Sequence, residues 1–273
     1  MHPKKLLGQN FLVDRNLLRV VADAAEIGEE DIVLEIGAGT GSLTEIIAER
    51  AKAVIAVEKD DALFEIARGS LAPLANVEVV HADIMGEDSA INPQIIQALR
   101  AKKSRRLRVV GDLPYYISTP LITALLTSPL RFKLMALTVQ REVAERLAAP
   151  PKTKEYGFLS VLVQLTAEVR LVKKLPPHVF WPRPKIWSAL LTIRPRLSPR
   201  EIKAMLPNVQ RLTSALFHQR RKDAAKALVA AGFASSKDEA AAILVEAGAP
   251  ATAKADALAP QQIKYIAEKS VER

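Results

Sequence analysis

The stretch "GDLPYYIS" (residues 111–118) places a carboxylate, a proline and two tyrosines in one short turn. The preceding residues, "LRVVG", are typical of a buried strand, and "STPLITALL" is typical of a helix. Aspartate, glycine and proline are ordinary turn residues and indicate no function by themselves. Open α/β sheets, however, bind ligands beyond the carboxyl ends of their strands. Two aromatic rings at such a position therefore predict a binding pocket.

A glycine-rich loop follows an earlier predicted strand, in "VLEIGAGTGSLTE". Gly37, Gly39 and Gly41 would let the backbone turn sharply and approach a ligand at the N-terminus of the next helix. The spacing departs from the dinucleotide pattern G-x-G-x-x-G, because the third glycine comes one residue early and Ser42 holds the expected place. Glu35 stands two residues before the first glycine.

Two further acids end the next two predicted strands. Glu58, which lies 17 residues after Gly41, can accept hydrogen bonds from both hydroxyls of an adenosine ribose. Asp83, in "HADIM", is placed to reach an adenine amino group. Each acid alone is also explained as a surface, capping or turn residue. Together with the glycine loop, at the ends of successive strands, they predict a nucleoside-containing cofactor.

An α/β sheet is needed to bring these residues together. Apolar runs of strand length alternate with segments of helical period, and the runs are 31–37, 53–58, 77–84, 108–113 and 134–139. Strands that are apolar almost throughout predict a parallel sheet covered by helices on both faces. We expect the segments 157–175 and 188–195 to extend this sheet at its edge.

The pattern changes near Pro195. Ser198 and Pro199 mark a helix N-terminus, and only helical periodicity follows, at about 202–231, 236–247 and 260–269. The sequence therefore predicts an α/β domain over residues 1–197 and a small all-helical domain over residues 198–273.

Composition excludes several classes of protein. The chain has no cysteine, so disulfides and thiolate metal sites are excluded, and its four histidines are scattered without ligand-like spacing. We therefore expect no metal. No apolar run has the length of a signal peptide or a membrane span, so we expect a cytoplasmic protein without membrane association. We further expect a monomer.

Charge is distributed unevenly along the chain. Residues 1–100 hold 9 Lys and Arg against 17 Asp and Glu, whereas residues 101–273 hold 30 against 13. Such asymmetry predicts a polyanionic partner for the second part of the chain. Two clusters are candidate phosphate-binding sites, "KKSRRLR" with Arg105 and Arg106, and "RRK" with Arg220, Arg221 and Lys222 in a predicted helix. A solvated helix face is the plainer explanation of either cluster.

In this order, "EIGAGTGSLT", "VEKD", "HADI" and "GDLPYYIS" resemble class I S-adenosylmethionine methyltransferases that modify adenine N6. The segments "LGQNFL", "FWPRPKIWSALL" and "FHQRRKDAAKAL" narrow the resemblance to the KsgA/RsmA family, the small-subunit ribosomal RNA adenine N6,N6-dimethyltransferases. The resemblance runs from Leu6 to beyond Leu228. It implies a Rossmann-like methyltransferase sheet and a C-terminal helical RNA-binding domain. It also implies dimethylation of two adjacent adenosines in the 3′-terminal hairpin of 16S ribosomal RNA during ribosome biogenesis.

The resemblance also implies roles for individual residues. S-adenosyl-L-methionine would be the methyl donor, held by Asn10, Leu12, Gly37, Gly39, Glu58, Asp83 and Asp112. The catalytic residues would be Asp112, Leu113, Pro114 and Tyr115. The family pattern is Asn-Leu-Pro-Tyr, so Asp112 is a departure from it. Trp187 is a second departure, because the family usually carries an aspartate there.

The proposed chemistry explains the turn at 111–118. The amine of adenine is a poor nucleophile, and two acceptors aimed at its N–H bonds would orient it and stabilise positive charge developing on nitrogen. The Asp112 carboxylate and the Leu113 carbonyl are the candidates. Pro114 shapes the turn, and Tyr115 would stack on the extruded base, with Tyr116 and Phe11 completing the pocket.

Three alternative functions remain open. A catalytically idle RNA-binding or ribosome-assembly factor on the same scaffold would keep the basic surfaces and lose cofactor residues. A large-subunit ribosomal RNA methyltransferase of the resistance type shares many of the motifs. A nicotinamide oxidoreductase is disfavoured by the glycine spacing.

Overall fold

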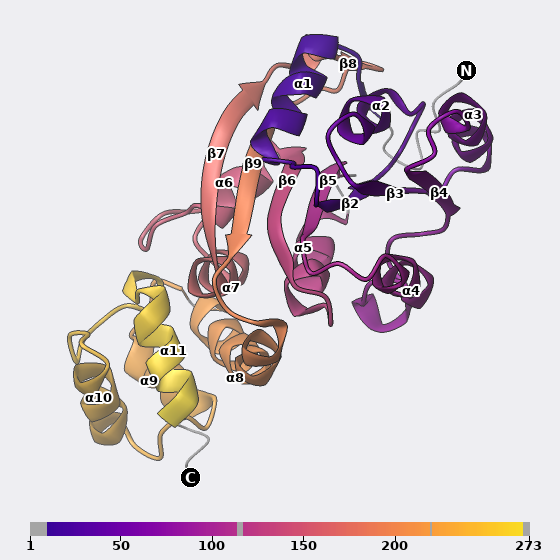
Figure 1. The fold of residues 1–273 in the computed structure, drawn as a ribbon. Helices are drawn as coiled ribbons and strands as arrows, with labels where there is room; N and C mark the ends of the chain where they lie inside the picture. The colour runs from indigo at the N-terminus through magenta and orange to yellow at the C-terminus, as the bar shows by residue number, and fades with distance from the viewer. Residues whose placement is uncertain (1–9, 114–116, 219, 270–273) are drawn as a thin grey trace. The chain divides into compact units, whose positions relative to one another are not determined.

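A computed structural model describes residues 10–113, 117–218 and 220–269 (Figure 1). A seven-stranded sheet has the order β4-β3-β2-β5-β6-β9-β7, and β1 pairs with β8 in a second, two-stranded sheet. The large sheet consists of β2 (Ile32–Ile36), β3 (Ala53–Glu58), β4 (Val77–His81), β5 (Leu107–Asp112), β6 (Phe132–Gln140), β7 (Ala167–Leu175) and β9 (Ser188–Pro195). The small sheet consists of β1 (Phe11–Leu12) and β8 (Phe180–Trp181).

The predicted α/β class is confirmed. Strands β2 to β6 pair in parallel, whereas β9 runs antiparallel to β6. Helices cover both faces of the sheet, with α1, α2 and α3 on one face and α4 and α5 on the other (Figure 1). These helices are α1 (Arg15–Ala24), α2 (Ser42–Ala48), α3 (Asp61–Leu71), α4 (Pro93–Ala101) and α5 (Ser118–Thr127).

Burial explains why the central strands form. Every residue of β2 is buried, as expected for a parallel strand covered on both faces. A glycine at the end of β5 allows close approach to β2, because a Cβ at Gly111 would lie 2.8 Å from the Ile36 carbonyl oxygen. The close pairing of β2 and β5 therefore brings the glycine loop and Asp112, at the end of β5, to one edge of the sheet.

Side-chain caps begin several helices. Asp14 accepts the Asn16 and Leu17 N–H groups at the start of α1, a helix that was not predicted from the sequence. At the predicted start of α8 (Pro199–His218), Ser198 and Glu201 form a reciprocal capping box: the Ser198 N–H donates to the Glu201 carboxylate and the Glu201 N–H to the Ser198 hydroxyl.

Three predicted elements differ from the structure. The segment 157–175 is not one strand, because α7 (Phe158–Thr166) precedes β7. The helix predicted over 202–231 is interrupted after His218, and α9 covers Ala224–Ala230. Strand β4 ends at His81, so Asp83 lies just beyond it. Apolar runs do not distinguish strand from buried helix by periodicity alone, which explains the error at α7.

The chain forms two compact units. The first comprises residues 1–144 and 170–195, and the second comprises residues 145–169 and 196–273. The predicted division at 197/198 places 145–169 in the α/β domain, whereas its contacts group this segment with the second unit. Buried Tyr156 illustrates the reason, since its hydroxyl donates to the Leu258 carbonyl at 2.8 Å.

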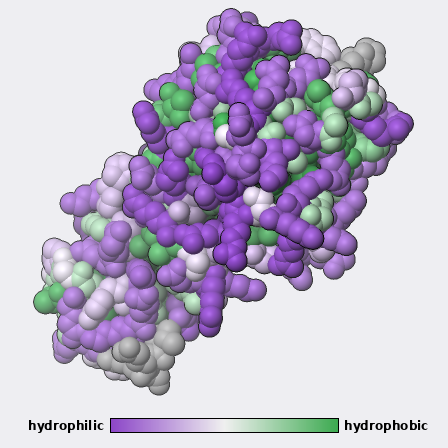
Figure 2. All heavy atoms as spheres, in the orientation of Figure 1, coloured by the Kyte–Doolittle hydropathy of each residue, from purple (hydrophilic) through white to green (hydrophobic). Residues whose placement is uncertain are grey.

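The second unit packs its helices around a separate apolar core that includes Val161, Leu212, Leu228, Leu244 and Ile263. Its remaining helices are α10 (Lys237–Glu246) and α11 (Pro260–Lys269), and α6 (Arg141–Leu147) follows β6. Within the described part of the chain, none of the helices has the length and apolar character required to span a bilayer. The face drawn in Figure 2 is mostly hydrophilic, with small scattered apolar areas.

Candidate active site

A cavity of about 620 Å³ lies at the carboxyl ends of β2, β3 and β5. Its lining includes Ile36, Glu58 and Asp112, which end these three strands. Strand order reverses here, because β3 and β5 flank β2 while the chain visits β3 and β4 before it returns to β5. This is the topological position at which open α/β sheets bind ligands, and the volume suits a small-molecule cofactor.

The glycine loop forms one wall of the cavity. Gly37, Gly39 and Gly41 have φ values of +82°, +59° and +88°, a backbone conformation that residues other than glycine rarely adopt. The Gly37 and Ala38 N–H groups both donate to the Val57 carbonyl of β3. A Cβ at Gly39 would lie 3.4 Å from the Phe11 ring, which is ordinary contact, so the positive φ rather than a lack of space requires glycine here.

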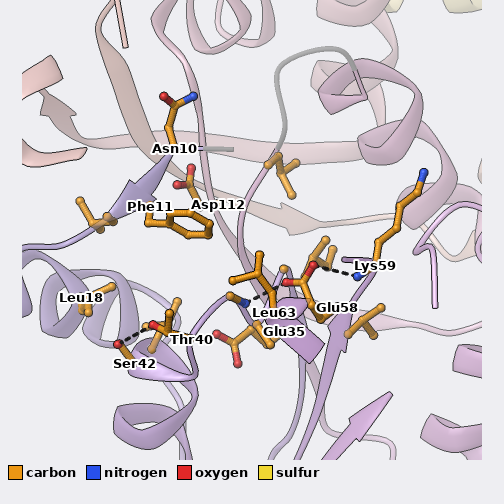
Figure 3. A pocket seen from close by; sticks show the side chains of 18 of the residues that line it. Asn10, Phe11, Leu18, Glu35, Thr40, Ser42, Glu58, Lys59, Leu63 and Asp112 are labelled. Carbon is orange, nitrogen blue, oxygen red and sulfur yellow. Dashed lines mark hydrogen bonds between the residues drawn. The ribbon is translucent and has the colours of Figure 1, made fainter. Parts of the chain in front are cut away.

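Glu58 joins the loop to the end of β3. One carboxylate oxygen accepts the Gly39 N–H at 2.9 Å, and the other accepts the Lys59 and Asp60 N–H groups at 2.9 and 2.8 Å. The residue is only 7 % exposed and lines the cavity. These three backbone donors hold the carboxylate in a defined position at the cavity wall. Figure 3 shows Glu58 there, with Lys59 beside it.

Asp83 lines the cavity beyond the end of β4. One of its oxygens accepts the Met85 N–H at 3.0 Å, and the other pairs with the Lys59 ammonium at 2.6 Å. The hydrogen bond from the Met85 N–H is a turn contact, as expected if Asp83 were only a turn residue. Its position on the cavity nevertheless leaves it able to meet a bound ligand.

Glu35 is a buried acid beneath the glycine loop. It is 1 % exposed, and neither carboxyl oxygen has a hydrogen-bond partner among the described residues. Burial raises the pKa of Glu35 to about 8, and the nearby Glu58 charge adds to the shift. The cavity wall therefore contains a carboxyl that is neutral at pH 7.

Of the predicted catalytic residues, the structure describes Asp112 and Leu113. Asp112 is half-buried on the cavity wall, and desolvation raises its pKa to about 8. Leu113 is buried and also lines the cavity, and its N–H donates to the Thr138 carbonyl of β6 at 2.9 Å. Pro114 and Tyr115, together with Tyr116, lie outside the described residues.

The two-stranded sheet closes another side of the cavity. Phe11 pairs with Trp181, and Leu12 pairs with Phe180, which joins "GQNFL" to "FWPRP". Asn10, Phe11, Leu12 and Trp181 all line the cavity. Figure 3 shows Asn10, Phe11 and Asp112 close together, with Glu58 and Lys59 elsewhere around the pocket.

All of the predicted cofactor residues therefore line one cavity, namely Asn10, Leu12, Gly37, Gly39, Glu58, Asp83 and Asp112. Glu35 stood out in the sequence without a role, and Lys59 and Trp181 were not predicted as lining residues. The only sequence signal for Lys59 as a lining residue is its position directly after Glu58. Among the described residues, no cluster of three or more potential metal ligands occurs.

The "RRK" cluster is not helical. Arg220, Arg221 and Lys222 lie in the turn between α8 and α9, so the prediction that they share a helix was wrong. The Arg220 guanidinium donates to the Lys154 carbonyl at 2.6 Å and to the Thr153 carbonyl, which gives it a structural role within the second unit. Arg221 and Lys222 are exposed and remain candidates for phosphate contacts.

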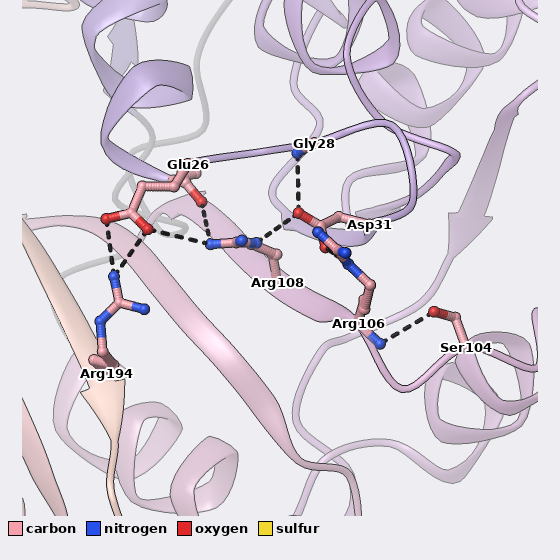
Figure 4. A network of polar contacts seen from close by, with 8 residues as sticks. Glu26, Gly28, Asp31, Ser104, Arg106, Arg108 and Arg194 are labelled. Atoms are coloured by element: carbon pink, nitrogen blue, oxygen red, sulfur yellow. Dashed lines mark hydrogen bonds and ion pairs between the residues drawn. The ribbon is translucent and has the colours of Figure 1, made fainter.

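The arginines at and just before the start of β5 differ in whether they bind a protein carboxylate. Arg105 is exposed, whereas Arg106 and Arg108 bind the fully buried Asp31 carboxylate at 2.9 and 2.8 Å (Figure 4). Burial would raise the pKa of Asp31, but hydrogen bonds from Arg106 and Gly28 and the charge of Arg108 outweigh it, so the pKa is lowered. Arg106 is thus engaged in an ion pair with a buried carboxylate, although its own side chain stays 48% exposed.

A second cavity, of about 910 Å³, lies in the second unit between α8 and α9. Four basic side chains line it together with the acidic Asp223, and they are Arg211, His218, Lys222 and Lys226. Only Lys222 belongs to a cluster that the sequence singled out, because the other three are spread over two helices and become neighbours through folding.

The model for the family "Ribosomal RNA adenine dimethylase" matches residues 2–268 of the chain. Ribosomal RNA small subunit methyltransferase A of Ligilactobacillus salivarius is 42% identical over 220 residues, covering 80% of this chain and 73% of the relative. The protein of the same name from Moorella thermoacetica is 42% identical over 238 residues, covering 86% and 82%.

Two solved structures are similar over nearly the whole chain. The crystal structure of 23S rRNA methyltransferase ErmE has a TM-score of 0.68 at 26% identity, covering 95% of this chain and 98% of the other. A dimethyladenosine transferase from Plasmodium falciparum has a TM-score of 0.76 at 23% identity, covering 94% and 95%, and this likeness supports the fold alone.

Proposed function

Because the chain belongs to the ribosomal RNA adenine dimethylase family, we propose that it transfers methyl groups from S-adenosylmethionine to adenine N6 of small-subunit ribosomal RNA. We place the target adenosines, two adjacent ones each dimethylated, in the 3′-terminal hairpin of 16S RNA. The observation that carries the proposal is the single cavity lined by the glycine loop, Glu58, Asp83 and Asp112.

The cavity fits the cofactor through the chemistry of its donors and acceptors. When bound, S-adenosylmethionine supplies an electrophilic methyl group on a sulfonium. The fixed Glu58 carboxylate already accepts three backbone N–H groups, which leaves about one lone-pair position for a ribose hydroxyl. Asp83 offers an acceptor for the adenine amine. Asn10, Leu12, Gly37 and Gly39 provide the surrounding wall.

Asp112 would orient the amine of the target base. In the absence of cofactor its raised pKa keeps it protonated at pH 7. A neutral carboxyl still presents a carbonyl oxygen, the same acceptor that the amide of the family's asparagine would present. We infer that this equivalence allows aspartate at the family's asparagine position.

Leu113 would supply the second acceptor through its carbonyl oxygen. Its N–H donates to the Thr138 carbonyl on the neighbouring strand, and its side chain is buried, which fixes the position of Leu113 at the end of β5. Pro114 and Tyr115 keep their proposed roles in shaping the turn and stacking on the base. The residues of this chain would thus act by positioning and by stabilising charge on N6.

RNA binding would use exposed cations outside the cavity. Arg221 and Lys222 are exposed in the second unit, and Arg105 is exposed in the first. Arg220 and Arg106 were also predicted to have this role, but both are bound to protein groups in the structure. We therefore assign phosphate contacts chiefly to Arg105, Arg221 and Lys222.

The decisive experiment incubates the protein with methyl-labelled S-adenosylmethionine and separately with unmethylated small and large ribosomal subunits. We expect label on small subunits only, at N6 of adenosines in the 3′-terminal hairpin. Label on large subunits only would favour the function named for the structurally similar ErmE. Absence of transfer with retained subunit binding would favour a non-catalytic assembly factor.

The Asp112 variants test the mechanism in the same assay. Asp112→Ala should slow transfer by roughly 100-fold or more with little change in subunit affinity, because the acceptor matters most as charge develops. Asp112→Asn should retain activity. Wild type should transfer faster as the pH rises through the pKa of Asp112, which the positively charged cofactor lowers below its cofactor-free value of about 8, because the ionised carboxylate is a stronger acceptor. The asparagine variant should lack this step.

A further inference from the structure

A basic and aromatic segment of the first unit has no role in the proposed function. Residues 170–187, here called the tryptophan strap, contain five Lys or Arg and no Asp or Glu. Both tryptophans of the chain, Trp181 and Trp187, lie within it. The sequence alone offered no explanation for Trp187.

The two tryptophan side chains of the strap are exposed to solvent. Trp181 is 46 % exposed and Trp187 is 44 % exposed. Arg183 and Lys185 lie between the two tryptophans, each directly after a proline, and both are exposed. Neither has an acidic partner among the residues that the structure describes. Exposed tryptophans close in sequence to exposed cations make this segment a candidate interaction site.

The strap is continuous with the active-site cavity. At one end, Trp181 pairs with Phe11 and lines the cavity together with Asp112. At the other end, the Trp187 carbonyl accepts the Arg141 N–H at 3.0 Å, just beyond β6. Strand β6 is the direct neighbour of β5, which ends in Asp112. The strap therefore runs along the edge of the sheet where the reacting base would enter.

We propose that the tryptophan strap binds unpaired ribosomal RNA next to the target adenosine, with Trp181 and Trp187 stacking on bases and Arg183 and Lys185 contacting phosphates. The proposal rests on the proposed function. Aromatic side chains interleaved with cations are how proteins hold single-stranded nucleic acid, because every base has a face for stacking and every nucleotide carries a negative charge. A tryptophan in place of an aspartate also removes an acid that would repel phosphate.

The tryptophan content of the chain gives a direct assay. Since both tryptophans lie in the strap, intrinsic tryptophan fluorescence reports on this surface and on no other. We would titrate the full chain with a fluorescein-labelled single-stranded RNA of mixed sequence and follow its anisotropy, with tryptophan emission followed on the unlabelled RNA. Binding should quench the emission, and a duplex of the same sequence should quench it far less.

Variants test each part of the strap. Trp187→Ala should weaken binding of the single-stranded RNA by roughly 5- to 100-fold, and Trp187→Phe should retain most of the affinity. The double variant Arg183→Ala/Lys185→Ala should lower the slope of log affinity against log salt by about 0.7 for each phosphate that the variant no longer neutralises. Tyr265→Ala removes an aromatic ring of similar exposure (39 %) from the second unit and is the matched control.

The outcomes separate the strap from the proposed function. If wild type methylates small subunits but Trp187→Ala binds RNA normally and RNA leaves the fluorescence unchanged, the strap proposal is wrong and the proposed function stands. If wild type methylates no ribosomal RNA, the proposed function fails independently of the variants. A blue shift of emission with anionic phosphatidylglycerol vesicles, without any response to RNA, would instead make the strap a membrane-binding surface.

Discussion

Replacing Glu35 with glutamine should remove a pH-dependent loss of stability from the cofactor-free protein. The carboxyl is 1 % exposed, and neither oxygen has a hydrogen-bond partner within the described part of the chain. Its pKa is raised from 4.5 to about 8 in the folded state. Below pH 4.5 the carboxyl is protonated in both folded and unfolded chains, so it imposes no difference there. As the pH rises above 4.5, the unfolded chain loses the proton and the folded chain keeps it.

The size of the effect follows from the two pKa values. The folding free energy loses about 1.4 kcal/mol for each pH unit between them and is constant above pH 8. Between pH 5 and pH 9, the ionisable Glu35 should therefore cost wild type about 4 kcal/mol relative to the glutamine variant. A buried amide with unsatisfied donors costs about 1–3 kcal/mol at every pH. The pH dependence of the difference, rather than its value at one pH, is therefore the quantity to measure.

The assay is urea denaturation of wild type and Glu35→Gln at each pH unit from 5 to 9, without cofactor. The exposed Glu49→Gln, at the end of α2, is the control for loss of a charge and should follow wild type. We expect the stability difference between wild type and Glu35→Gln to change steadily with pH up to about 8 and to stay constant above it. Parallel curves for these two proteins would show that Glu35 is ionised in the folded protein and that water reaches its carboxyl.

Three further predictions concern other parts of the molecule. Asp31→Asn should lower the free energy of unfolding by about 3 kcal/mol, because the buried Arg108 loses its carboxylate partner at 2.8 Å and keeps the longer contact to Glu26 at 3.8 Å, and urea denaturation would measure this. Glu58→Ala should weaken S-adenosylmethionine binding by about 1–3 kcal/mol in calorimetry, whereas unchanged affinity in a folded variant would remove Glu58 from the site. Neutralising Arg221 and Lys222 should reduce the slope of log subunit affinity against log salt by roughly 0.7–0.9 for each phosphate no longer neutralised, with cofactor affinity unchanged, and an unaltered slope would make them solvated surface residues.

The cofactor side of the site was predictable from the sequence because its determinants are local. Gly37, Gly39 and Gly41 are needed for backbone conformations within one loop, and Glu58 ends a strand that a continuous apolar run identifies. Parallel pairing then brings successive strand ends to one edge, so linear order predicts the spatial arrangement. The extent of β3, 53–58, was predicted to the residue.

The basic clusters were less predictable because charge in a sequence does not indicate its partners. Arg106 binds Asp31, which lies 75 positions earlier, and Arg220 binds carbonyls 67 and 66 positions earlier. No local pattern distinguishes these arginines from the exposed Arg105 and Arg221. In the same way, the antiparallel pairing of β9 with β6 and the helix α7 depend on contacts between distant segments.

Glu35 and Asp112 together bear on the replacement of the family's asparagine by an acid. Both carboxyls lie on the wall of one cavity, and the pKa of each is raised to about 8. A cavity with both acids ionised at pH 7 would add two charges to those of Glu58 and Asp83, and that repulsion would destabilise the cofactor-free protein. Because both stay protonated, Asp112 can stand in for a neutral amide without this cost. A positively charged cofactor would favour ionisation of Asp112. The aspartate would therefore resemble a neutral amide in the cofactor-free protein and become a stronger hydrogen-bond acceptor than asparagine once the methyl donor is bound.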